Sequence, residues 1–116
     1  MDSRKDNLLA AGAIDAAVDM KPGTISRDIF CDESIFEIEF PRIFERSWLF
    51  VGHTSQLAKP GDFFLSKMGR ESVIVVRDRA GDIQVILNSC RHRGMPVCRY
   101  DQGNTAAFTC TYHGWT

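Results

Sequence analysis

The sequence has no excess of charge of either sign and no long hydrophobic run. Its 116 residues contain 14 Lys and Arg against 15 Asp and Glu, a formal net charge of −1 at pH 7. Proteins that bind nucleic acids or anionic membrane surfaces usually carry a basic excess. No stretch approaches the roughly 20 apolar residues of a membrane-spanning helix, and residues 1–7 are not followed by the hydrophobic region of a signal peptide. We therefore expect a cytoplasmic protein that binds neither nucleic acid nor membrane.

Cysteine and histidine are also scarce, with four Cys and three His. In a reducing compartment, cysteines that lie far apart in the chain are more often metal ligands or buried thiols than disulfide partners. Two of the histidines, His92 and His113, lie two or three residues after a cysteine. This coincidence indicates a metal site.

The chain divides into three consecutive parts. Residues 1–30 are expected to form a loosely ordered leader, residues 31–48 a helical segment and residues 49–116 the main domain. Apolar side chains recur at helical spacing after Asp32, which is a suitable N-cap residue. Because Pro41 lacks a backbone N–H, we expect a kink there, or two short helices with Pro41 at the first position of the second.

The main domain is predicted to be mainly β. Residues 63–67 and 72–77 flank a short turn and predict a hairpin, the second strand being rich in β-branched residues. Further strands are predicted at residues 83–87, after the turn 78–82, and at residues 106–109. The Cys–His pairs then lie on two loops of a small antiparallel sheet.

Two short motifs, separated by 17 residues, carry the candidate donors. The first is Cys-x-His and the second Cys-x-x-His, and a glycine, Gly94 or Gly114, follows each. The four candidate ligands are Cys90, His92, Cys110 and His113. Two thiolates and two imidazoles suit the two irons of a Rieske-type [2Fe–2S] cluster, in which histidines replace two cysteines and raise the reduction potential.

The same donor set could hold structural zinc. Zinc fingers, however, pair Cys with Cys and His with His in sequence, whereas each pair here is mixed. We therefore interpret the motifs as a Rieske site and keep zinc as the alternative.

CRHRG at residues 90–94 and CTYHGW at residues 110–115 resemble the cluster motifs of aromatic ring-hydroxylating dioxygenases, in their large (α) subunits. SWLFVGH at residues 47–53 and PGDFF at residues 60–64 are similar to the toluene/biphenyl type of these enzymes. The resemblance covers roughly residues 25–116. It implies that the chain is the N-terminal part of an α subunit, an oxidoreductase.

By this resemblance, Cys90 and Cys110 would ligate one iron, and His92 and His113 the other. Electrons from NADH would arrive through a reductase and usually a ferredoxin, and would continue to a mononuclear Fe(II) that cis-dihydroxylates an aromatic ring. That iron belongs to a catalytic domain whose ligands cannot be built from the three histidines here. We therefore expect no catalytic residue in this chain and no activity of the chain alone. Further α subunits and a small β subunit are the expected partners.

The motifs also depart from those of respiratory Rieske proteins. Met95 and Tyr112 stand where those proteins have a disulfide between their cluster loops, and Trp115 replaces a serine that bonds a cluster sulfide. Fewer hydrogen bonds to sulfur imply a potential near the lower end of the roughly −150 to +300 mV Rieske range.

A stand-alone Rieske ferredoxin-type electron carrier is the alternative function. Such a protein would open directly into strands and hold its motifs near the middle of the chain. Here a helical segment comes first, and His113 lies three residues before the last residue. We therefore expect the Rieske domain, residues 49–116, to be truncated at its C-terminus.

Five other residues invite a functional interpretation. Cys98 falls outside both motifs and is interpreted as a structural thiol. His53 is expected to be packed or hydrogen-bonded rather than a ligand. Arg91, Arg93 and Arg99 form either a solvated charged rim or a docking surface for an acidic ferredoxin or a neighbouring subunit.

Overall fold

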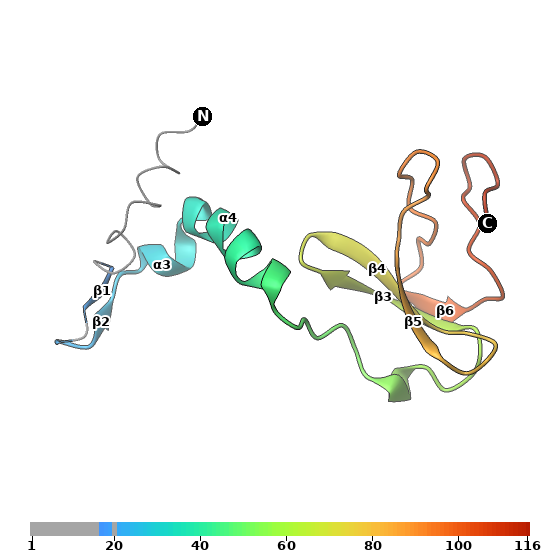
Figure 1. Cartoon of the computed structure of the whole chain (residues 1–116), viewed down its shortest axis with the longest axis horizontal. Coiled ribbons are helices and arrows are strands. Elements are labelled where there is room, and N and C mark those ends of the chain that lie inside the picture. The colour runs from blue at the N-terminus through green and yellow to red at the C-terminus, as the bar shows by residue number, and fades with distance from the viewer. Residues whose placement is uncertain (1–16, 20) are drawn as a thin grey trace. The chain divides into compact units, whose positions relative to one another are not determined.

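A computed structural model describes residues 17–19 and 21–116 (Figure 1). The chain separates into two compact units, Met1–Trp48 and Leu49–Thr116. Most of the predicted leader, residues 1–16 and 20, lies outside the described residues.

The described part of the first unit begins with a small hairpin. Strands β1 (Val18–Asp19) and β2 (Thr24–Ile25) pair antiparallel. Gly23 has a φ of +69°, which an L residue adopts only at a cost. The four-residue helix α3 (Asp28–Cys31) follows.

The main helix of this unit is α4 (Glu33–Arg42). Asp32 caps it as predicted, because its side chain accepts a hydrogen bond from the Ser34 N–H at 2.8 Å. The prediction that Pro41 begins a second helix is wrong, whereas the alternative of a kink at Pro41 stays a prediction. Pro41 lies in the last turn of α4, and the chain then forms the short 3₁₀ helix η1 (Phe44–Arg46).

The second unit is built on a four-stranded antiparallel sheet. Its strands are β3 (Asp62–Met68), β4 (Glu71–Arg77), β5 (Ile83–Leu87) and β6 (Gln102–Asn104), in the order β5-β4-β3-β6 (Figure 1). The predicted hairpin and the predicted strand at residues 83–87 are confirmed. The hairpin closes where Met68 pairs with Glu71, and Gly69 takes a φ of +62° in the tight turn between them.

The predicted strand at residues 106–109 is wrong, and the fourth strand is β6 instead. The segment 102–104 lacks β-branched residues but pairs with the start of β3, where Gly103 lies opposite Phe63. A Cβ on Gly103 would lie 3.1 Å from the Phe63 ring, so the glycine permits this close approach. Phe108 lies outside any strand. Its apolar ring packs on Phe63, with ring centroids 5.2 Å apart.

Two small clusters of buried side chains hold the sheet together. One contains Leu57, Phe64 and Val75, and the other Phe63, Ile74 and Cys98. Leu57 follows the short 3₁₀ helix η2 (Thr54–Gln56). Among the described residues, no helix has the length and apolar character needed to cross a membrane.

Candidate metal centre

The first motif lies in a loop that follows β5 and is closed by a tight backbone turn. The Cys90 N–H donates to the Met95 carbonyl at 2.8 Å, and the Gly94 N–H donates to the Cys90 carbonyl at 2.8 Å. Gly94 has a φ of +71°, in the left-handed region that favours glycine. The turn therefore requires a glycine four residues after the cysteine.

The second motif repeats this turn. The Cys110 N–H donates to the Trp115 carbonyl at 2.7 Å, and the Gly114 N–H donates to the Cys110 carbonyl at 2.9 Å. Gly114 has a φ of +72°. The two loops thus share one backbone turn, and the histidine sits two residues after the cysteine in the first and three in the second. Both loops project on the same side of the sheet in Figure 1, where they are orange and red.

The loops bring the four candidate ligands together as two pairs. Cys90 and Cys110 are buried, with 7% and 2% of their surface exposed, and the Cys90 side chain is one of the groups that lower the pKa of Cys110. His92 and His113 are exposed, and their ring centroids lie 4.8 Å apart. The structure therefore segregates a buried sulfur pair from an exposed nitrogen pair.

This segregation distinguishes between the two metal sites that the sequence left open. Structural zinc is held by four ligands around one ion. A Rieske cluster needs a cysteine pair on one iron and a histidine pair on the other. The residues present fit that cluster better than a single ion.

The surroundings of Cys110 favour its thiolate. Hydrogen bonds from the backbone N–H groups of Tyr112 and then His113 lower the pKa of Cys110, and the Cys90 side chain and the charge of Arg99 act in the same direction. Burial opposes them by raising the pKa. Since metal-binding cysteines must be deprotonated, the turn itself prepares this sulfur for a metal.

Aromatic side chains of the second loop contact both imidazoles. The Trp115 indole stacks on His92 of the first loop, with ring centroids 5.0 Å apart and planes within 6°. The ring centroids of Tyr112 and His113 lie 3.9 Å apart. Trp115 thus links the two loops, a role that sequence reasoning missed because no local pattern predicts a contact between the motifs.

The other residues singled out from the sequence do not join the donor pairs. Cys98 is 6% exposed and packs in the sheet core, as expected of a structural thiol. His53 caps η2, where its Nδ1 accepts from the Ser55 N–H at 3.2 Å. Arg91 and Arg93 are exposed. All four cysteines are free.

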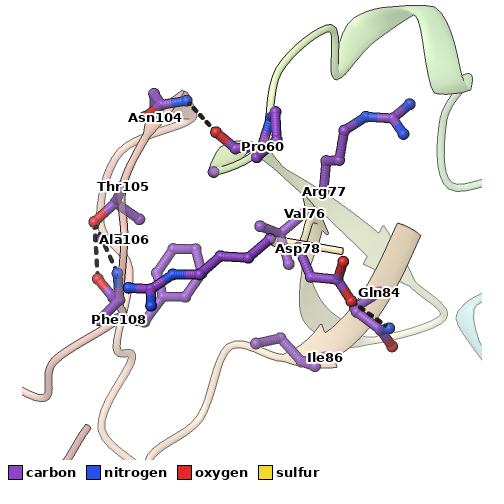
Figure 2. Close-up of a pocket in the computed structure, with 13 residues that line it drawn as sticks. Pro60, Val76, Arg77, Asp78, Gln84, Ile86, Asn104, Thr105, Ala106 and Phe108 are labelled. Carbon is purple, nitrogen blue, oxygen red and sulfur yellow. Dashed lines mark hydrogen bonds between the residues drawn. The ribbon is translucent and has the colours of Figure 1, made fainter. Parts of the chain in front are cut away.

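Among the hollows on this unit, two differ in their relation to the donors. One, of about 730 Å³, borders the donor loops and is lined by Cys90, Trp115 and the exposed side chains of Ile86 and Leu87. The other, of about 390 Å³, lies away from the donors between the β4–β5 turn and residues 104–108 (Figure 2). Two of its polar side chains are hydrogen-bonded within the protein: Gln84 donates to Asp78 and Asn104 donates to the Pro60 carbonyl.

The family model for the Rieske [2Fe-2S] domain matches residues 47–116. The chain belongs to the Rieske [2Fe–2S] family. Among curated relatives of this Rieske chain, the benzene 1,2-dioxygenase subunit alpha of Pseudomonas putida strain F1 is 50% identical over 102 residues, which are 88% of this chain and 23% of the relative. The biphenyl 2,3-dioxygenase subunit alpha of Rhodococcus jostii strain RHA1 is 52% identical over 98 residues, 84% of this chain and 21% of the relative.

Solved structures agree with this placement. Naphthalene 1,2-dioxygenase from Rhodococcus sp., bound to indole, superposes with a TM-score of 0.78 at 35% identity, over 99% of this chain and 25% of that one. The Rieske chain therefore spans about a quarter of the length of the proteins it matches. The named relatives are oxidoreductases of the ring-hydroxylating type, which confirms the predicted family, and none of them supports the alternative of a stand-alone ferredoxin.

Proposed function

We propose that Cys90 and Cys110 bind one iron of a [2Fe–2S] cluster and that His92 and His113 bind the other. The observation that carries this assignment is the pairing of the two thiols inside the protein and of the two imidazoles, 4.8 Å apart, at its surface. When bound, the cluster accepts and releases single electrons.

The chain's own residues prepare this site in three ways. The buried position of the two cysteines keeps water from their sulfurs. The backbone N–H groups of Tyr112 and His113 lower the pKa of Cys110 and so favour the form that binds metal. Stacking of Trp115 on His92 orients one imidazole from the opposite loop.

We propose further that the protein serves as the electron-transfer part of an aromatic ring-hydroxylating dioxygenase α subunit. The support is the sequence identity of 50–52% to α subunits of benzene and biphenyl dioxygenases. In this role it would receive electrons that originate from NADH through a ferredoxin or reductase, for delivery to a mononuclear iron that cis-dihydroxylates an aromatic ring. Other α subunits and a small β subunit would complete the assembly. A cytoplasmic location is part of the proposal, and the four free cysteines are consistent with a reducing compartment.

Substitution of single cysteines tests the ligand assignment. Cys110→Ala in the full-length protein should abolish the visible bands and the EPR signal of the reduced cluster, whereas Cys98→Ala, a buried cysteine outside the motifs, should retain both. Metal analysis should find iron and acid-labile sulfide rather than zinc. Zinc in the wild-type protein, or a full cluster signal in Cys110→Ala, would refute the proposal.

A further inference from the structure

A buried asparagine closes the neck of the first ligand loop. Asn88 follows β5, and its backbone N–H donates to the Ser72 carbonyl at 2.9 Å, which extends the β4–β5 ladder by one residue. Its side chain makes a reciprocal pair of bonds with Cys98: Nδ2 donates to the Cys98 carbonyl at 2.8 Å, and Oδ1 accepts from the Cys98 N–H at 2.8 Å. Asn88 is 7% exposed, so water does not compete for these groups.

The residue at the other end of this bond pair is fixed to the core. The Cys98 side chain packs with Phe63 and Ile74, and Ile74 has no exposed surface. The Cys98 thiol also donates to the Tyr100 carbonyl at 3.4 Å. Asn88 therefore ties the start of the loop to an end that the sheet core already holds.

Both candidate ligands of the first loop lie inside the closed segment. Cys90 and His92 come two and four residues after Asn88. The second loop has a weaker closure, because the hydroxyl groups of Thr109 and Thr116, 3.0 Å apart, are exposed. The first loop is thus the one whose geometry depends on a buried side chain.

We infer that Asn88 is a positioning residue for the cluster: it holds Cys90 and His92 in register with the second loop without touching the metal site. The inference rests on the proposed function, since it requires both residues to be ligands. Asn88 lies in neither donor motif. Its partners are the backbone N–H and carbonyl of Cys98, a residue that is not a proposed ligand. Leaving a buried donor or acceptor unpaired shifts a local equilibrium by about tenfold per group.

The test compares truncation of two asparagines in the full-length, cluster-loaded protein. Asn88→Ala removes both bonds to Cys98 and the longer one, 3.4 Å, to the Ser72 hydroxyl, whereas Asn88→Asp keeps the acceptor for the Cys98 N–H and loses the donor. Asn104→Ala is the control for loss of a bridging asparagine, because Asn104, although exposed, also joins two segments outside the ligand loop, donating to Pro60 at 3.0 Å and Asp62 at 2.8 Å. The readouts are the rate of iron release to a chelator, the EPR g-values of the reduced protein and hydrogen exchange of the Cys98 amide.

Asn88→Ala should release iron at least about tenfold faster than the wild type. Its EPR signal should shift in g-value or broaden, and the Cys98 amide should become accessible to hydrogen exchange. Asn88→Asp should also release iron faster than the wild type, because its buried carboxylate faces the Cys98 carbonyl with no proton to donate, and it decides the question alone if Asn88→Ala is not recovered folded. Asn104→Ala should lower Tm and leave iron release and g-values unchanged.

Two results would overturn the inference. One is wild-type iron release and g-values in the Asn88 variants; the other is an equal change in Asn104→Ala. A wild-type protein without a [2Fe–2S] spectrum refutes the proposed function and the inference together, whereas a normal wild-type spectrum with insensitive Asn88 variants refutes the inference alone.

Discussion

Replacing the glycine of either ligand loop by alanine should destabilise the protein through backbone conformation alone. Gly94 and Gly114 have φ values of +71° and +72°. An added Cβ would meet nothing within 4 Å at Gly114, and at Gly94 only the Ser89 hydroxyl at 3.9 Å, an ordinary contact. The left-handed conformation costs an L residue roughly 1–2 kcal/mol, so each alanine should lower the free energy of unfolding by about that amount. Asparagine tolerates this region better and should cost less.

Urea unfolding of the full-length variants, followed by circular dichroism, measures this cost, and iron release is measured in parallel. Gly81→Ala is the control, because Gly81 has a φ of +96° with open space around it, in the turn between β4 and β5. It should lose similar stability and retain iron normally, whereas the two loop variants should also release iron faster. A loss above about 3 kcal/mol at Gly114, or equal losses for alanine and asparagine, would refute the conformational explanation.

Ile74→Ala should lower the free energy of unfolding by about 2–5 kcal/mol in urea titrations, because Ile74 has no exposed surface; a loss below about 1 kcal/mol would contradict its central place in the core. A hydrogen bond from Asn104 lowers the pKa of Asp62, so this carboxylate should stabilise the protein fully above about pH 4 and lose that effect as the pH falls through the lowered pKa. In Asp62→Asn the urea midpoint should depend less on pH below about pH 4, and an unchanged pH dependence would show that Asp62 does not contribute to acid destabilisation. Joint reversal of Arg91 and Arg93 to Glu should slow reduction by an acidic ferredoxin in a salt-dependent way; an unchanged rate would leave them as a solvated rim.

Local signals in the sequence were enough to predict much of the fold. The hairpin of β3 and β4 and the strand β5 follow from β-branched runs bounded by turn residues. The cap at Asp32 needs only a side chain and an N–H two residues away. The approach of the two cysteines and of the two histidines agrees with what the resemblance to ring-hydroxylating dioxygenases implies, and their role as ligands stays a prediction.

Features that depend on distant partners could not be predicted in this way. Strand β6 has no strand-like composition and exists because Gly103 admits the Phe63 ring. Residues 106–109 were predicted as a strand from their composition. Phe108 instead packs its ring on Phe63 without strand pairing, and composition alone does not distinguish the two cases. The bonds of Asn88 to Cys98 join residues ten positions apart across a loop, and no local sequence pattern specifies such a contact.

The division between buried thiols and exposed imidazoles makes the two sides of the proposed cluster unequal as electrical contacts. The sulfur side is insulated by protein, since Cys90 and Cys110 are almost wholly covered, while His92 and His113 face solvent. Solvent access and local dielectric tune a metal centre's potential. With the proposed ligands, any protein that covers the imidazoles would change the driving force for electron transfer by the act of docking. The face that carries the imidazoles would then both pass the electron and set the reduction potential at which it passes.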